Sequence, residues 1–182
     1  MAFKSQKLTL EIPVHIGSYK MFIETCCSFV SDFEPLSGDF KRLSKFKLVI
    51  MELLTNAMKH TRATSFLELE TAENEIVIKK IDSGSRFSFS DSKTEKVHNF
   101  PLTDFEYPTQ LTALLGNNYK LDIIVKNESL IEFLEPPEID YLSLNEIPEN
   151  FGLMVIRQCA SSFHYHYNHP EGKNTFEVVF KF

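Results

Sequence analysis

The chain has 182 residues, of which 43% are hydrophobic, with 17 Phe and no Trp. This length suits a single domain over 1–182 that buries about two-thirds of the surface of the unfolded chain. The balance of 19 basic and 25 acidic residues gives a net charge of −6, which argues against direct nucleic-acid binding through a basic face. No apolar run approaches the roughly 20 residues of a membrane-spanning helix, so we expect no membrane partner.

The first residues, MAFKSQKLTLEI, lack the apolar core of a signal peptide, so we expect a cytoplasmic protein. Cys26, Cys27 and Cys159 form neither a C-x-x-C pair nor an even-numbered set. We therefore expect reduced thiols, because a disulfide framework needs paired cysteines in an oxidising compartment.

The N-terminal third predicts one strand and two helices. Alternating apolar residues predict a strand over 7–14, and a helix follows from Ser18 to about Phe33. Its apolar side contains Met21, Phe22, Phe29 and Val30. A second helix is predicted over 43–61, because its apolar residues recur at three- and four-residue intervals. They form one buried stripe: Ile50, Leu53, Leu54, Ala57 and Met58.

The other side of the 43–61 helix carries a polar row. Glu52, Asn56 and His60 are four residues apart, so they project in line, with Lys59 at the margin. A carboxamide oxygen suits Mg²⁺, an ammonium suits phosphate, and a carboxylate can accept a proton. The spacing alone is more typical of a solvated helix face, because such polar rows are common on surface helices.

A hairpin of two strands, 66–70 and 75–81, is predicted directly after this helix. Its second strand runs into the segment IDSGSRF, residues 81–87. The C-terminal part predicts a helix that begins at NFGL, residues 150–153, and two closing strands over 163–167 and 175–182.

Three of these segments resemble the motifs of the GHKL ATPase superfamily, in the order in which that superfamily has them. ELLTNAMKH resembles its N-box, DSGSRF its G1 box, and NFGL its G2 box. The pair Asn174-Thr175 stands where the superfamily has Gly-Thr. The match is closest to the bacterial anti-sigma-factor serine/threonine kinases, because the chain begins with a strand and a helix.

The resemblance implies a Bergerat-type ATP-binding fold. This is an α/β (α+β) two-layer sandwich, in which helices cover one face of a mixed or antiparallel sheet. The resemblance also implies that the stretch 88–148 contains the ATP lid and an insertion. Within that stretch the sequence predicts a hairpin of 120–125 and 130–134, and a polar, mobile segment over 88–98.

By the same resemblance the site would hold ATP and Mg²⁺. Glu52 would be the catalytic residue, Asn56 would bind Mg²⁺, and Asp82 would accept a hydrogen bond from the adenine amino group. The remaining cofactor-binding residues would be Lys59, His60, Gly84, Gly152, Leu153 and Thr175.

The implied activity is phosphorylation of a serine or threonine on a small antagonist protein, with capture of a sigma factor when the antagonist is phosphorylated. Family members often form homodimers. Two alternatives remain: a nucleotide-binding interaction module that no longer transfers phosphate, and the catalytic domain of a sensor histidine kinase. The sensor-kinase alternative has less support, because in sensor kinases a helical hairpin with a phosphorylatable histidine precedes the N-box, and the sequence before this N-box predicts no such hairpin.

Three family glycines are replaced here, by Arg86, Asn150 and Asn174. If a replaced glycine has φ above zero, a side chain costs about 1–2 kcal/mol, or roughly tenfold in affinity. We therefore expect weaker but not abolished nucleotide binding.

The segment HYHYNH places His164, His166 and His169 close together near the C-terminus. Alternate residues of a strand share a face, and imidazole is a good metal ligand. The sequence favours the simpler interpretation, a strand with histidines on its wetter face, because no other ligand adjoins them.

Overall fold

The computed structural model describes residues 5–34, 36–60, 63–115, 119–136 and 151–182. The described helices are η1 (Ile16–Ser18), α1 (Tyr19–Ser31), α2 (Phe40–His60) and α3 (Phe151–Cys159). The N-terminal strands are β1 (Gln6–Glu11), β2 (Ser65–Ala72) and β3 (Glu75–Asp82). The central strands are β4 (Ser88–Asp91), β5 (Val97–Asn99), β6 (Thr109–Leu115), β7 (Tyr119–Asn127) and β8 (Leu130–Phe133). The last two are β9 (Ser162–Asn168) and β10 (Lys173–Lys181).

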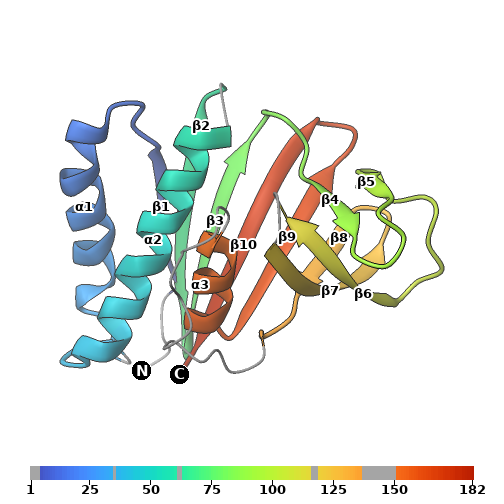
Figure 1. The fold of residues 1–182 in the computed structure, drawn as a ribbon. Helices are drawn as coiled ribbons and strands as arrows, with labels where there is room; N and C mark the ends of the chain where they lie inside the picture. The colour runs from blue at the N-terminus through green and yellow to red at the C-terminus, as the bar shows by residue number, and fades with distance from the viewer. Residues whose placement is uncertain (1–4, 35, 61–62, 116–118, 137–150) are drawn as a thin grey trace.

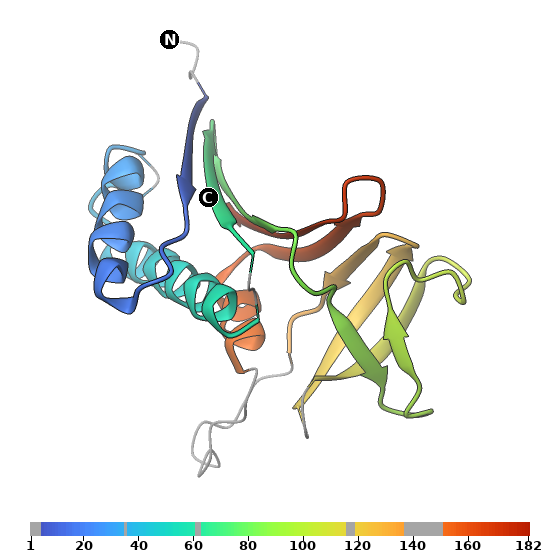
Figure 2. The same cartoon turned by 90° about the horizontal axis from the view of Figure 1, so that it is seen from above.

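All ten described strands form one antiparallel sheet in the order β1-β2-β3-β10-β9-β8-β7-β6-β4-β5. The α+β class and the antiparallel sheet agree with the sequence analysis. The helices α1, α2 and α3 lie on one face of the part of the sheet formed by β1, β2, β3, β10 and β9 (Figure 1). We call these helices and strands the helical half. Seen from above, the sheet curves, and β4–β8 turn toward the side that holds the helices (Figure 2).

Helix α2 begins three residues earlier than the sequence pattern predicts. The Asp39 carboxylate accepts a hydrogen bond from Arg42 N at 3.0 Å, so Asp39 caps the free donors of the first turn. Its buried stripe includes Phe46 and Val49 as well as the predicted Ile50, Leu53, Leu54 and Ala57. These two residues move the centre of the stripe away from Met58, which is 49% exposed and was wrongly assigned to the core.

Helix α1 packs through Phe22, Cys26 and Val30, which are spaced four residues apart. Met21 is exposed, contrary to the sequence prediction, because it lies beside this stripe. The helix, together with the β1 strand that precedes it, forms the outer edge of the helical half (Figure 1).

The part of the 88–148 stretch that the structure describes continues the sheet. The predicted hairpin is confirmed as β7 and β8, which pair antiparallel. The prediction of a mobile polar segment over 88–98 is wrong, because β4 and β5 pair there and bury Phe89 and His98. The alternation Phe-Ser-Phe-Ser over 87–90 is the strand signal in this segment.

One hydrophobic core runs through both halves of the sheet. Phe87 joins them, since its ring lies 5.8 Å from that of Phe133 and 5.9 Å from that of Phe176. Phe133 in turn stacks on Phe163 at 4.4 Å. Within the described part of the chain, no helix is both long and apolar enough to cross a bilayer.

Candidate functional site

A pocket of about 520 Å³ lies between the C-terminal end of α2 and the middle of the curved sheet. Its lining comes from α2, α3, the ends of β3 and β6, the segment 85–88, and strands β9 and β10. Five of the residues that the sequence predicts for a nucleotide site line it together: Asn56, Lys59, His60, Asp82 and Leu153.

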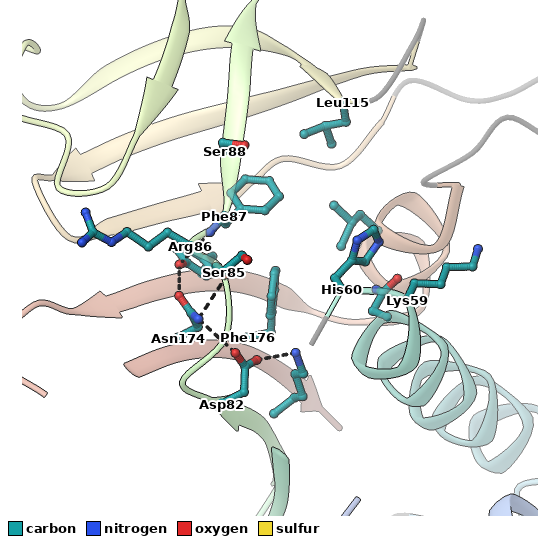
Figure 3. Close-up of a pocket in the computed structure, with 14 residues that line it drawn as sticks. Lys59, His60, Asp82, Ser85, Arg86, Phe87, Ser88, Leu115, Asn174 and Phe176 are labelled. Carbon is teal, nitrogen blue, oxygen red and sulfur yellow. Dashed lines mark hydrogen bonds and ion pairs between the residues drawn. The ribbon is translucent and has the colours of Figure 1, made fainter. Parts of the chain in front are cut away.

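The α2 side of the pocket carries the polar row of the helix. His60 rises over the pocket, whereas the ammonium end of Lys59 extends away from it (Figure 3). Burial lowers the pKa of His60, and the nearby cations Lys59 and Lys80 lower it further. The imidazole is therefore neutral at neutral pH, and acidification gives it a charge.

Glu52 lies one turn before Asn56 and does not line the pocket. It packs against Gly152 of α3, where a Cβ atom would lie only 2.3 Å from Glu52 Oε2 and 3.8 Å from Asn56 Oδ1. Glycine therefore allows α3 to approach this carboxylate closely. Burial raises the pKa of Glu52, and the charge of Lys59 partly opposes that shift.

The floor of the pocket is a buried carboxylate at the end of β3. Asp82 is 4% exposed, and its Oδ1 accepts hydrogen bonds from Gly84 N at 2.8 Å and from Asn174 Nδ2 at 3.0 Å. Its Oδ2 forms an ion pair with Lys80 Nζ (Figure 3). Gly84 lines an adjoining shallow depression together with Lys59 and His60.

Asn174 connects the floor to the segment that leads to β4. Besides Asp82, its Nδ2 lies within hydrogen-bond distance of the carbonyl oxygens of Gly84, at 3.2 Å, and Ser85, at 3.3 Å. Its Oδ1 accepts from the Tyr165 hydroxyl, which itself accepts from Phe87 N at 3.1 Å. One carboxamide thus fixes the course of the segment that forms one wall of the pocket.

The replaced family glycines carry no backbone strain where the structure describes them. Among the described non-glycine residues, only Glu95 has a positive φ, so Arg86 and Asn174 do not occupy the left-handed region. The strain penalty considered from the sequence does not apply to these two. Arg86 lines the pocket, but its guanidinium extends away from the pocket centre (Figure 3). Its Nη1 lies 2.9 Å from Phe100 O, and the guanidinium lies over the Tyr167 ring. Asn150 lies outside the described residues.

Thr175 is not brought to the pocket, contrary to the expectation from the resemblance. Asn174 and Phe176 line the pocket, and successive residues of a strand point to opposite faces. Thr175 therefore lies on the opposite face of β10, beside Ile81 and His166 in the register of the sheet.

Sequence reasoning missed Lys80, Tyr165 and Asn174, all of which line the pocket. A signal for Lys80 was available, because in β3 it continues the alternation of Ile76 and Ile78, the residues that face the core. A lysine in phase with buried positions requires a partner, and Asp82 is the next residue on that face.

Within the described residues, no three acidic, thiol or imidazole groups gather as a metal site, and His164, His166 and His169 belong to no such group. A scan against protein-family models and a search of curated proteins gave no match to the chain.

Proposed function

We propose that the pocket binds ATP with Mg²⁺ and that the helical half of the chain is a nucleotide-binding fold of the GHKL type. The observation that carries the proposal is that Asn56 of α2 and Asp82 of β3 line one pocket. They come from the two motifs that the resemblance assigns to metal and adenine. The helices on one face of the antiparallel sheet support the same proposal (Figure 1).

The pocket fits an adenine base. Its volume of about 520 Å³ falls in the range of roughly 300–1,000 Å³ typical of small-molecule sites. Phe87, Phe176 and Leu153 offer apolar surface to a planar ring. A carboxylate has about four acceptor positions, and three donors already reach Asp82, so one position remains for an amino group.

The α2 side of the pocket fits the charged part of the nucleotide. The Asn56 carboxamide would hold Mg²⁺, which takes few protein ligands and keeps water and phosphate oxygens in its shell. His60 would compensate phosphate charge, and Lys59 would do so with its ammonium turned toward the pocket. The first turn of α3, which contains Gly152, adjoins Asn56, and the backbone N–H groups and dipole of a helix N-terminus favour phosphate.

The activity that we propose is ATP-dependent phosphorylation of a serine or threonine on a small antagonist protein, coupled to capture of a sigma factor. Bound Mg²⁺–ATP supplies the phosphoryl group and neutralises its charge. Glu52 would accept the proton of the attacking hydroxyl, and its raised pKa makes it a stronger base than an exposed glutamate.

A second candidate is a nucleotide-binding interaction module without phosphoryl transfer. The position of Glu52 favours it, because the carboxylate packs against Gly152 and does not line the pocket. The two candidates share the nucleotide site and differ in whether Glu52 reaches a substrate hydroxyl.

Nucleotide binding is tested by thermal unfolding with and without Mg²⁺–ATP. At a ligand concentration of one hundred times the dissociation constant, the free energy of unfolding should rise by about 2.7 kcal/mol. Asn56→Ala should abolish most of this gain, whereas Thr55→Ala, one residue away on α2 and absent from the pocket lining, should retain it. No gain in the wild type at millimolar nucleotide would reject the proposed site.

Transfer is tested with γ-labelled ATP, Mg²⁺ and the small antagonist protein encoded nearest to this chain. The kinase proposal expects a labelled serine or threonine, and loss of label with Glu52→Gln while nucleotide binding persists. Nucleotide binding without any transfer by the wild type supports the interaction module instead.

A further inference from the structure

Lys80 places a buried cation in the floor of the pocket. The residue is 2% exposed, lines the pocket, and forms an ion pair with Asp82, which is also buried. Its ammonium lies 5.5 Å from the centroid of the Phe176 ring, another lining residue. Nothing in the proposed roles of Asn56, Asp82 or Glu52 requires a lysine at this position.

Stability alone is a weak explanation for this lysine. Removing an ammonium and a carboxylate from water costs several kcal/mol per ion, and a buried pair often adds no net stability over apolar residues. Asp82 is also held by Gly84 N and Asn174 Nδ2 without the lysine. Small-molecule pockets are mostly apolar with a few precisely placed polar groups, and Lys80 and Asp82 supply two such groups here.

The pair presents a donor and an acceptor side by side to whatever enters the pocket. An ammonium has only donors and a carboxylate has only acceptors. The Watson–Crick edge of adenine carries the complementary groups on adjacent atoms, since its 6-amino group donates and its N1 accepts. The same edge of guanine is reversed, because O6 accepts and N1–H donates.

We propose that Lys80 is the residue that selects adenine, donating a hydrogen bond to N1 while Asp82 accepts one from the 6-amino group. This inference rests on the proposed nucleotide site and names the base that the site takes. The ammonium has three N–H groups, so it can contact N1 and remain paired with Asp82. Phe87 and Phe176 flank the base with apolar surface.

The same arrangement selects against guanine. In the orientation that suits adenine, guanine would place O6 against the Asp82 carboxylate and N1–H against the Lys80 ammonium. A site built to hydrogen-bond one pattern rejects the reversed pattern, because its buried polar groups are then left without partners. Hydrogen bonds to charged groups correspond to about 10- to 100-fold in affinity each.

The test measures dissociation constants for ATP, 1-deaza-ATP, the triphosphate of unsubstituted purine riboside, and GTP, each with Mg²⁺. 1-Deaza-ATP differs from ATP only by a C–H in place of N1. We expect the wild-type protein to bind it about 10- to 100-fold more weakly than ATP. Purine riboside triphosphate lacks the 6-amino group that Asp82 would contact, so it should bind more weakly than ATP. GTP should lose at least as much affinity.

Two variants assign the effect to the side chain. Lys80→Met should bind ATP and 1-deaza-ATP within about threefold of each other, because the donor to N1 is gone. Lys79→Met is the matched control, since Lys79 is adjacent in β3, pairs with Glu177 and does not line the pocket. It should keep the wild-type ratio. If Lys80→Met fails to fold, Lys80→Gln, which keeps a weaker neutral donor, should show an intermediate ratio.

The outcomes separate this inference from the proposed function. Equal affinity of the wild type for ATP and 1-deaza-ATP overturns the role of Lys80 and leaves ATP binding intact. Tighter binding of GTP than of ATP overturns the choice of adenine. Absence of binding by all four nucleotides overturns the proposed site itself, and the role of Lys80 with it.

Discussion

The carboxamide of Asn174 bridges β10 and β3 by donating a hydrogen bond from Nδ2 to Oδ1 of Asp82 at 3.0 Å. The two residues are also direct partners in the register of the sheet. Tyr165, from the neighbouring strand β9, donates to the same carboxamide. Three strands therefore converge on Asn174, and a glycine at this position would lose all of these side-chain bonds.

Asn174→Ala should lower the free energy of unfolding by about 1–3 kcal/mol, because it leaves buried partners without hydrogen bonds. Urea unfolding measures this change, with Asn168→Ala as the control. Asn168 lies in the adjacent β9, and its carboxamide accepts one long bond, at 3.4 Å, from Glu171 N. Its replacement should change stability by about 0.5 kcal/mol or less. An equal effect of both substitutions would contradict the bridging role of Asn174.

The elements that the sequence predicted well are those whose signals are local. The repeat of Leu53, Leu54 and Ala57 identifies α2, and the polar turn before Glu75 identifies the β2–β3 hairpin, because in each case the pattern spans one element. The Asn56 and Asp82 pocket followed from the family resemblance, since the two residues lie on separate elements that only the fold brings together.

The features that the sequence did not predict depend on contacts between distant residues. The Asn174 network requires β9 and β3 to flank β10, which no local pattern specifies. The face on which Thr175 lies follows from the register of β10, and a shift of one residue reverses it. The strands β4 and β5 are only four and three residues long, and polar residues predominate over 88–98, so composition alone favoured a loop.

Breaking the buried Lys80–Asp82 pair should be costly. Lys80→Met leaves the Asp82 carboxylate buried without its cation, so we expect a loss of about 3–5 kcal/mol in the free energy of unfolding. The double variant K80M/D82N should recover most of this loss. Its amide removes the charge and keeps an acceptor oxygen for Gly84 N and Asn174 Nδ2.

Lys79→Met provides the control for that prediction as well. The Lys79–Glu177 pair is 38% and 34% exposed, so its loss should cost less than about 1 kcal/mol. Denaturant unfolding of the wild type, K80M, D82N and K80M/D82N gives the coupling energy between Lys80 and Asp82. Additive effects of K80M and D82N would show that the pair contributes no coupling.

The contact between Gly152 and Glu52 predicts a substitution whose effect changes sign with its background. Gly152→Ala alone should destabilise the protein by up to about 1 kcal/mol, because the new Cβ overlaps the carboxylate end of the flexible Glu52 side chain, which must move. In the Glu52→Ala background the space is free. The same substitution should then stabilise the protein by up to about 1 kcal/mol, since alanine favours helix α3 over glycine.

Gly17→Ala serves as the reference, because a Cβ there meets no atom within 4 Å and the residue lies outside α2 and α3. Gly17→Ala should change the free energy of unfolding by the same amount with and without Glu52. Thermal or urea unfolding gives the stability of six proteins: the wild type and the Glu52→Ala variant, each alone, with Gly152→Ala, and with Gly17→Ala. If Gly152→Ala were equally destabilising with and without Glu52, the close approach of the two helices at this point would be wrong.

The lowered pKa of His60 predicts how nucleotide affinity responds to pH. Burial and the cations Lys59 and Lys80 keep the imidazole neutral at neutral pH, and the carboxylate on the floor, Asp82, is already paired with Lys80. As the pH falls below the ordinary histidine value of 6.5, His60 gains a proton. A positive imidazole attracts phosphate, so the affinity for Mg²⁺–ATP should rise on acidification.

His60→Gln removes this charge, so the ratio of wild-type to variant affinity isolates it from the titration of the nucleotide. We expect the ratio to increase, up to about fivefold, as acidification charges the imidazole, because a partly exposed charge pair is worth about 1 kcal/mol. His169→Gln is the control, since His169 is exposed and does not line the pocket. A ratio that stays constant with pH would place the phosphates away from His60, and an increase with His169→Gln as well would assign the effect to net charge.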